Sequence, residues 1–140
     1  MSAPQETLVL IKPDGVARNL TGEILSRIES KGYQLVDIHM VQPDRDVLRE
    51  HYAEHEGKPF YDPLVTFMES GPVVAIRVAG HRVIEGIRSL CGATDPTQAA
   101  PGTIRGDLGR DWGLAVQQNI IHASDSPETA ERELALWFPS

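Results

Sequence analysis

The chain is poor in cysteine, has no long apolar run and carries fewer basic than acidic residues. Its only cysteine, Cys91, cannot form an internal disulfide, which fits a reducing compartment, and free cysteines usually pack in the interior. No stretch approaches the roughly 18 apolar residues of a membrane span, and no early basic stretch precedes an apolar run. We therefore expect a cytoplasmic protein with no secretory signal, in which Cys91 packs at a helix end.

The charge balance limits the possible partners. With 20 acidic and 13 basic residues, the formal net charge is −7. Such a surface repels polyanions, and no dense basic cluster is present, so a dedicated nucleic-acid binder is not expected. An anionic ligand would need a local basic pocket.

Size and composition are those of an ordinary globular protein. The 140 residues are 41% hydrophobic and 24% charged. A chain of this length can bury about two thirds of its unfolded surface. We expect a single domain over residues 1–140.

Short apolar runs alternate with helical patterns along the chain. Strands are predicted over 7–11, 35–41, 73–78 and 116–121, the first ending in a turn at 12–15. Helices are predicted from 21 to about 31 with Thr21 as the cap, from Asp44, over 61–70, over 81–90 and over 126–138. This order predicts an α+β fold, a ferredoxin-like split βαβ sandwich with a four-stranded antiparallel sheet covered by helices.

The segment 92–113 has no hydrophobic period and is predicted to be a loop. Loops of this length in compact domains are usually functional or disordered, and we favour a functional one. It contains Thr94 and Arg105.

A histidine ends the apolar run before the last predicted helix. His122 follows Ile120 and Ile121, which are predicted to be buried with Val116, and Ser126 and Pro127 then cap and begin the helix. The positive end of a helix dipole favours a nearby anion, so phosphate suits this histidine. A purely structural histidine is the alternative reading.

Three cations lie at the ends of predicted elements, namely Lys12, Arg88 and Arg105. Gathered together in an acidic protein, they would form a positive pocket for a polyphosphate, where positioning and electrostatics supply most of the catalysis. Taken singly, each is equally well explained as a solvated surface residue.

Five stretches resemble nucleoside diphosphate kinase in register from about residue 7 to 138. They are IKPDGVARN (11–19), HYAEHEGKPF (51–60), SGPVVA (70–75), GATDPTQAAPGTIRGD (92–107) and NIIHASDSPE (119–128). The resemblance implies ping-pong transfer of the γ-phosphoryl from a nucleoside triphosphate, mainly ATP, to a nucleoside diphosphate through phosphohistidine at His122. Glu133 matches the glutamate that orients the histidine ring.

The resemblance also implies the nucleotide site. Lys12 and Asn119 match residues that bind the ribose, with Lys12 also near the transferred phosphoryl. The positions implied to hold phosphates and ribose are Lys12, Tyr52, Arg88, Thr94, Arg105 and Asn119. Phe60 matches the aromatic residue that stacks on the base, and Val116 matches the apolar residue on its other face. Because every base has a π-face, such stacking implies broad base specificity.

The implied cofactor is Mg²⁺, which would bridge the phosphates and needs few protein ligands. Asp125 could touch it through water. The other histidines, at positions 39, 51, 55 and 81, show no spacing typical of a metal site, and the chain lacks the GxxxxGK[ST] pattern of a P-loop.

Two features depart from the family pattern. Ala123 replaces the glycine that commonly follows the histidine, which suggests that this position does not need a positive φ. The stretch between Arg105 and Asn119 is a few residues longer than in most relatives. The family implies a homo-oligomer, for which we favour a hexamer over a tetramer or dimer, and Trp137, Phe138 and Pro139 could lie at its interface.

Two other functions share the predicted fold. An RNA-binding module would show aromatic residues on its central strands and a basic face, and the predicted strands contain no aromatic residue. A degenerate homologue would bind nucleotide without turnover. The presence of both His122 and Glu133 favours an active enzyme.

Overall fold

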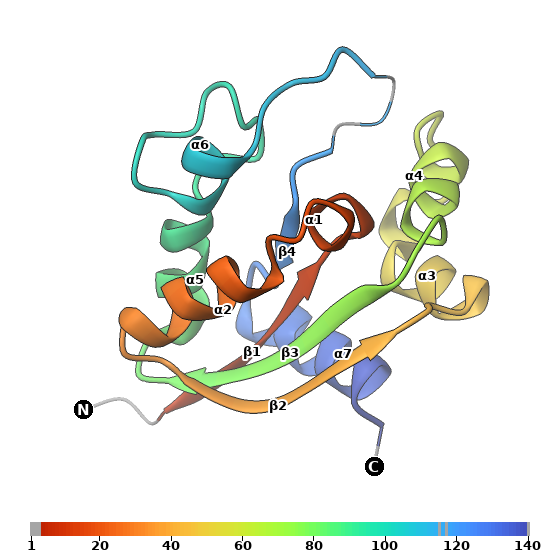
Figure 1. Cartoon of the computed structure of the whole chain (residues 1–140). Coiled ribbons are helices and arrows are strands. Elements are labelled where there is room, and N and C mark those ends of the chain that lie inside the picture. Colours follow the sequence, from red (N-terminus) through yellow and green to blue (C-terminus); the bar gives the residue numbers. More distant parts are fainter. Residues whose placement is uncertain (1–3, 115, 117, 140) are drawn as a thin grey trace.

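The sheet has four antiparallel strands in the order β2-β3-β1-β4 (Figure 1). The computed structural model describes residues 4–114, 116 and 118–139. The strands are β1 (Gln5–Ile11), β2 (Gln34–Val41), β3 (Val73–Gly80) and β4 (Ile121–Ala123). This order confirms the predicted α+β architecture with a ferredoxin-like sheet.

Helices connect the strands. They are α1 (Pro13–Ala17), α2 (Thr21–Ser30), α3 (Arg45–His51), the short 3₁₀ helix η1 (Ala53–His55), α4 (Tyr61–Met68), α5 (Val83–Cys91), α6 (Ile104–Leu108) and α7 (Pro127–Trp137). Two predicted caps are confirmed. The Asp44 side chain accepts from the Asp46 N–H at 2.7 Å, and the Ser126 hydroxyl accepts from the Thr129 N–H at 3.1 Å. No helix among the described residues is long and apolar enough to cross a membrane.

The sheet is covered on both faces, which gives two apolar clusters. Ile24 and Ile28 of α2 and Ile87 of α5 pack with one set of strand residues. Side chains from α3, α4 and α7 pack with the residues that point to the opposite face. In Figure 1, α7 lies behind the sheet and α2 in front of it. The fold is therefore a three-layer structure, with helices on each face of the sheet.

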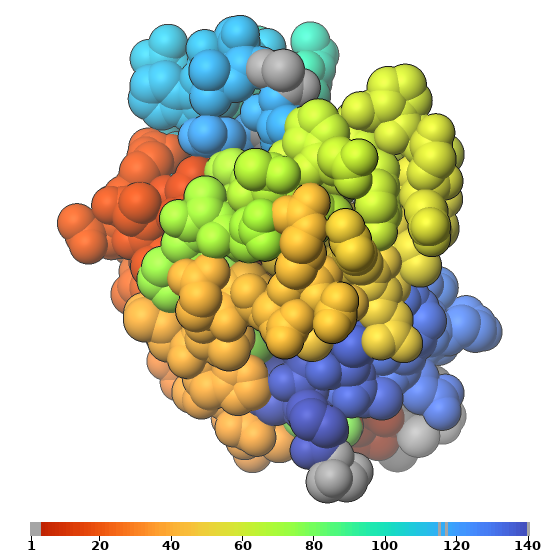
Figure 2. All heavy atoms as spheres, turned by 90° about the vertical axis from the view of Figure 1, so that its right-hand side faces the viewer, coloured from red at the N-terminus to blue at the C-terminus, as the bar shows by residue number. Residues whose placement is uncertain are grey.

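Strand β2 lies at the edge of the sheet and is poorly covered. Within the described residues it pairs only with β3. Val36, Ile38 and Met40 are 46%, 44% and 61% exposed. Figure 2 shows this orange strand on the surface beside the C-terminal helix. An edge strand with exposed apolar residues is a template for further pairing.

The fourth strand was predicted at the wrong position. It was expected over 116–121, of which residue 117 lies outside the described residues, but β4 begins only at Ile121. The backbone of Ile120 bonds elsewhere, because its N–H donates to Asp14 Oδ2 (3.0 Å) and its carbonyl accepts from the Lys12 N–H (2.7 Å). Ile120 also has a φ of 73°, which interrupts an extended path. His122 therefore lies within β4, opposite Leu10, and not after it.

Three local predictions also need correction. The predicted loop over 92–113 contains helix α6, whose cap is the Thr103 hydroxyl accepting from the Gly106 N–H at 3.0 Å. A helix of one turn is too short to show a hydrophobic period. The predicted turn at 12–15 forms the start of α1, with Pro13 at its first position. Leu20, and not Thr21, is the N-cap of α2.

Candidate active site

The residues predicted to carry chemistry meet at the edge where β1 ends. Lys12 follows β1, His122 lies in β4, Arg88 is in the last turn of α5, Arg105 is in α6, and Asn119 precedes β4. These residues come from segments that are far apart in the sequence. The antiparallel pairing of β1 with β4 brings the segment around Lys12 next to the segment around His122.

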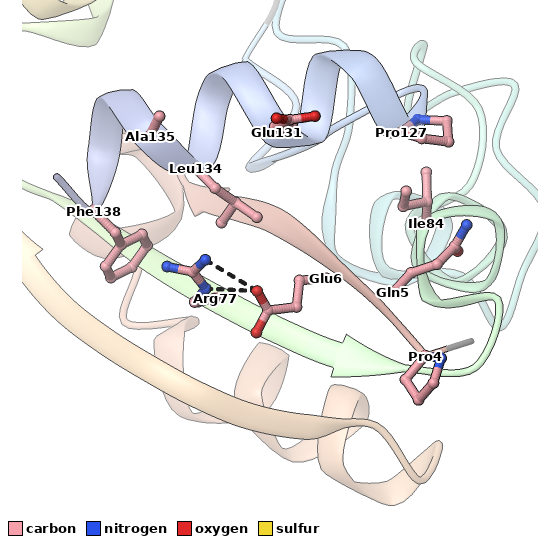
Figure 3. A pocket seen from close by; sticks show the side chains of 10 residues that line it. All are labelled: Pro4, Gln5, Glu6, Arg77, Ile84, Pro127, Glu131, Leu134, Ala135 and Phe138. Carbon is pink, nitrogen blue, oxygen red and sulfur yellow. Dashed lines mark hydrogen bonds and ion pairs between the residues drawn. The ribbon is translucent and has the colours of Figure 1, made fainter. Parts of the chain in front are cut away.

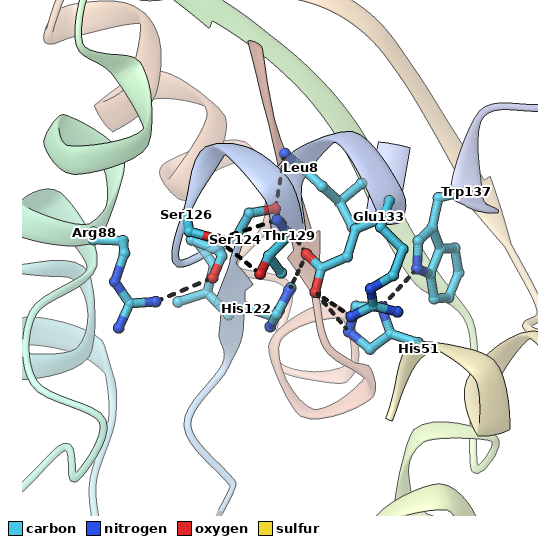
Figure 4. A network of polar contacts seen from close by, with 12 residues as sticks. Leu8, His51, Arg88, His122, Ser124, Ser126, Thr129, Glu133 and Trp137 are labelled. Carbon is cyan, nitrogen blue, oxygen red and sulfur yellow. Dashed lines mark hydrogen bonds and ion pairs between the residues drawn. The ribbon is translucent and has the colours of Figure 1, made fainter. Parts of the chain in front are cut away.

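His122 is held by a buried carboxylate. Its Nε2 lies 2.9 Å from Glu133 Oε1, and the Ser124 hydroxyl donates to the same oxygen at 2.7 Å (Figure 4). Glu133 is only 2% exposed, unlike most glutamates on helices. Because the carboxylate is an acceptor, the neutral imidazole carries its proton on Nε2 and keeps a lone pair on Nδ1.

Glu133 stays ionised despite its burial. Burial acts to raise the pKa of the Glu133 carboxyl, but the hydrogen bond and charge interaction with His122, helped by His51 and Ser124, lower it below its ordinary value. Ser124 is itself fixed, since its Oγ accepts from the Leu8 N–H at 3.4 Å. A negative charge is therefore kept beside the His122 ring at neutral pH.

Lys12 is a buried cation with a neutral partner. Its Nζ donates to Asn119 Oδ1 at 2.8 Å, and Asn119 in turn donates from Nδ2 to the Thr94 carbonyl at 2.9 Å. Burial, and next the nearby charge of Arg105, lower the pKa of Lys12 to about 8. A bound anion would offset both effects, so this arrangement favours a negatively charged ligand.

Arg105 is bound to three backbone carbonyls. Its Nε donates to Asn119 (3.2 Å), Nη1 to Gly92 (3.0 Å) and Nη2 to Ile121 (2.6 Å). Burial lowers the pKa of Arg105, which nevertheless remains a cation with no carboxylate partner among these bonds. The side chain ties α5, α6 and β4 together, and two of its five N–H donors are left for a ligand.

The remaining phosphate-binding candidates are more exposed. Arg88 is exposed and donates from Nη1 to the Ala123 carbonyl at 3.2 Å. Thr94 is exposed on the segment bound by Asn119. Asp125 is also exposed, and with Arg88 it lines a hollow of about 390 Å³.

Tyr52 is buried with an unpartnered hydroxyl. Its side chain is 8% exposed, and within the described residues its hydroxyl has no hydrogen-bond partner. Burial raises the pKa of Tyr52, and the Glu133 carboxylate adds to that effect. A buried unpaired hydroxyl is costly, which points to a ligand or water as its partner.

Phe60 is an exposed aromatic residue and not part of either apolar cluster. It is 45% exposed, with the His55 ring at 5.2 Å and Lys58 Nζ at 5.8 Å from its ring. Val116, predicted to be buried, is only half-buried. Both side chains are thus accessible to a flat ligand.

His51 was missed as a member of this group. It is 2% exposed, its ring lies edge-on to that of His122 at 4.6 Å, and its Nδ1 accepts from Trp137 Nε1 at 3.0 Å. The signal was its spacing, because positions 48, 51 and 52 share one helix face, and Leu48 and Tyr52 are buried. Trp137, predicted to lie at an interface, is only 5% exposed and packs inside its own chain.

One group of side chains could hold a metal ion among the described residues. Ligand atoms of His51, His122 and Glu133 all lie within 4.8 Å of one another. Two nitrogen donors suit zinc better than Mg²⁺, which prefers oxygen. In both histidines, however, the nitrogen that faces Glu133 is Nε2, and it carries the proton of the neutral ring. A metal ion at this position would have to displace both protons.

Cys91 and Ala123 behave as the sequence predicted. Cys91 is the last residue of α5 and is 1% exposed, and burial raises the pKa of its thiol to about 11, so it is not a nucleophile at neutral pH. Ala123 is not among the residues with positive φ, which explains why alanine fits after His122.

A larger hollow lies elsewhere. It has a volume of about 520 Å³ between α7, β1 and β3, with the Glu6–Arg77 ion pair (3.0 Å) on its wall (Figure 3). No predicted site residue lines it. The volume of a hollow therefore does not by itself identify the active site.

Comparisons with known proteins identify the family of this chain. The family model for nucleoside diphosphate kinase matches residues 5–140. A nucleoside diphosphate kinase of Streptomyces avermitilis is 60% identical over 136 residues, covering 96% of each chain, and one of Pyrococcus furiosus is 51% identical over 99% of this chain and 85% of that relative.

Solved structures agree as well. A halophilic nucleoside diphosphate kinase from Halobacterium salinarum in complex with CDP superposes with a TM-score of 0.92 at 46% identity, over 99% of this chain and 90% of the other. A transition-state mimic of the Borrelia burgdorferi enzyme with vanadate and ADP has a TM-score of 0.90 at 36% identity, over 98% and 88%. The chain described here therefore belongs to the nucleoside diphosphate kinase family of phosphotransfer enzymes.

Proposed function

We propose that this enzyme transfers the γ-phosphoryl of a nucleoside triphosphate, mainly ATP, to a nucleoside diphosphate by a ping-pong mechanism through phosphohistidine at His122. The observation that carries the proposal is the 2.9 Å contact between His122 Nε2 and the buried Glu133 carboxylate. It leaves Nδ1 as the free nucleophile beside three cations, Lys12, Arg88 and Arg105, that donate to amide and carbonyl oxygens rather than to carboxylates.

His122 keeps its Nε2 proton through both half-reactions. The Nδ1 lone pair attacks the γ-phosphorus, the new N–P bond forms as the bond to the β-phosphate oxygen breaks, and that oxygen leaves with the electron pair. The imidazole becomes positively charged, and the proton on Nε2 stays hydrogen-bonded to Glu133. A terminal phosphate oxygen of a second nucleoside diphosphate then attacks the phosphorus. The new O–P bond forms as the N–P bond breaks, and the electron pair returns to Nδ1, which restores neutral His122. Glu133 stabilises the charge that develops in each direction.

The phosphate and ribose contacts are proposed from the positions of the polar groups. Lys12, which is buried, would neutralise the transferred phosphoryl, while Lys12 and Asn119 would contact the ribose. Tyr52, Arg88, Thr94 and Arg105 would bind the remaining phosphate oxygens. These contacts do not involve the base.

Base binding is proposed to be non-selective. The exposed Phe60 ring and the half-buried Val116 side chain offer apolar surfaces rather than a pattern of hydrogen-bond donors and acceptors. The related structures named above hold CDP and ADP, a pyrimidine and a purine nucleotide. Broad base specificity follows from this chemistry.

Family members use divalent cations, and we propose Mg²⁺ for this chain. Asp125 provides one exposed carboxylate next to Arg88 and Ser126, which fits an ion held mainly by phosphates and water. When bound, Mg²⁺ neutralises part of the phosphate charge. The cytoplasmic location and the single-domain organisation over 1–140 remain predictions.

Self-association is proposed along β2. The unpaired edge of β2 and the exposed Val36, Ile38 and Met40 suit antiparallel pairing with a second copy. A hexamer built from such dimers remains our expectation.

The direct test is phosphoryl capture. Purified enzyme incubated with radiolabelled ATP and Mg²⁺ should acquire a label that is labile in acid, stable in alkali and transferred to added GDP as GTP. His122→Ala should acquire no such label and lose activity by roughly 10⁴-fold or more. Measurable ATP binding without any label in the unaltered enzyme would instead support a degenerate nucleotide-binding homologue.

A further inference from the structure

We propose that His51, with its ring fixed by Trp137, is a positioning residue that reserves the Glu133 carboxylate for His122. This inference rests on the proposed phosphoryl transfer through His122. His51 does not contact the reacting atoms and acts through Glu133.

The first step is the tautomer of His51. The indole N–H of Trp137 can only donate, and it lies 3.0 Å from His51 Nδ1, which must therefore accept. The neutral ring then carries its proton on Nε2. His51 Nε2 faces Glu133 Oε2 at 3.9 Å (Figure 4).

The second step is the charge state of the ring. Burial, and next the neighbouring His122, lower the pKa of His51 to about 3, so the ring is neutral at physiological pH. The other charged groups that act on it are Glu133 and Arg132 of α7 and Lys12 after β1. Protonation of Nδ1 would also break the bond from Trp137.

The third step concerns the two oxygens of Glu133. Oε1 accepts from both His122 and Ser124, at 2.9 and 2.7 Å. Oε2 lies 3.9 Å from His51 and 3.9 Å from Arg132 Nη2, beyond ordinary hydrogen-bond length. The N–H of the neutral His51 ring thus faces Oε2 at a distance too long for a hydrogen bond, where its dipole orients the carboxylate without drawing the negative charge away from His122.

The consequence appears during transfer. His122 becomes cationic as the N–P bond forms, and an undivided Glu133 charge stabilises it. A charged His51, or water in its place, would attract the carboxylate away from His122. Loss of the His51 and Trp137 pair should therefore slow the chemical step and leave nucleotide affinity almost unchanged.

The test is single-turnover phosphorylation by ATP, monitored by rapid quench, in His51→Leu, His51→Gln and Trp137→Phe. Neutral glutamine can accept from Trp137 and donate toward Glu133, whereas leucine can do neither. We expect His51→Leu to lower the maximal rate by about tenfold or more, as loss of an outer-shell partner commonly does, with less than about a twofold change in half-saturating ATP. His51→Gln should restore most of the rate.

Trp137→Phe keeps the ring and removes only the N–H. Its maximal rate should fall by less than that of His51→Leu, because the tautomer of His51 is no longer fixed. The loss should be the same at about pH 6 and about pH 8, because burial keeps the ring neutral. His81→Gln, which replaces an exposed histidine after β3, is the matched control and should leave the rate unchanged.

Equal rates in His51→Leu and the unaltered enzyme would overturn the inference. So would an equal loss in His51→Gln and His51→Leu, which would indicate packing alone. A ¹⁵N NMR spectrum of the unaltered enzyme keeps the inference testable if His51→Leu does not fold. It should show His51 protonated only on Nε2 at pH 6, and protonation on Nδ1 would contradict it. Absence of label in the unaltered enzyme would instead refute the proposed function itself.

Discussion

The two halves of the site are built differently. Beside His122, the side chains of Glu133, Ser124 and His51 are buried, and each has a side-chain partner fixed by the fold. On the proposed nucleotide-binding surface, Phe60 at 45% exposure, Arg88 and Thr94 are accessible to solvent. The surroundings of His122 are therefore pre-organised, whereas the surface proposed to bind the nucleotide is open.

This difference has a physical reason. A charge that develops during reaction is stabilised best by dipoles and charges that need no rearrangement, which demands burial and full hydrogen bonding. A binding surface that accepts several bases gains nothing from such constraint. The contrast predicts that substitutions in the buried half change rates, whereas those in the open half change affinity.

The largest effect is expected for Glu133→Gln, which tests the buried half of the site. The amide oxygen can still accept from His122 and Ser124, so the change removes the charge but not the shape. We expect the rate of His122 phosphorylation to fall by about 100-fold, with little change in half-saturating ATP. Rapid-quench labelling measures both, and an unchanged rate would show that the Glu133 charge is not used.

The open half is tested by Phe60→Ala. Loss of one stacking surface should weaken nucleotide binding by about 30-fold, because base stacking contributes roughly 1–3 kcal/mol. The effect should be similar for ATP, GTP, CTP and UTP, while the maximal rate remains near normal. Steady-state KM values for the four nucleotides provide the measurement, and a strong effect on one base only would contradict non-selective stacking.

Lys12 lies between the two halves, and its pKa of about 8 makes a pH prediction. The folded pKa is lowered from its ordinary value, so the free enzyme loses this cation as pH rises through 8. We expect the affinity for ADP to fall by about tenfold between pH 8 and about pH 10. Isothermal titration calorimetry at several pH values checks this, and Lys12→Met should abolish the pH-dependent part.

The smallest effect is expected at Trp112 in the segment before β4. It is 45% exposed, with Arg110 at 4.2 Å and Arg18 at 5.8 Å from its ring. Trp112→Ser should change the free energy of unfolding by less than about 0.5 kcal/mol and leave activity unchanged. Denaturant titration and steady-state assays measure these, and a large loss of activity would extend the pre-organised half to this segment.

Much of the fold could be predicted because its signals are local. The caps at Asp44 and Ser126 act within three residues, and three of the four strands were placed close to their observed positions. Strand β4 was misplaced because the Ile120 backbone bonds to Asp14 and Lys12, more than 100 positions away. No local pattern reports such a bond.

The same distinction between local and long-range features applies to the candidate site. Residues at strand and helix ends, such as Lys12 and Arg88, could be selected from sequence, and resemblance added Glu133. His51 was missed because its role depends on Trp137, which is 86 positions away. Chemistry-bearing residues can be proposed from types and motifs, but their partners cannot.

The sequence by itself determined the α+β architecture, most of the element positions and membership of a phosphotransfer family. Hydrophobic periods, caps and motifs are short-range features that a linear chain displays directly. Only the tertiary structure decided which nitrogen of His122 is free, which cations are buried and which ring packs beside His122. Protonation and charge state depend on burial and on partners brought together by sheet pairing, and neither exists until the chain has folded.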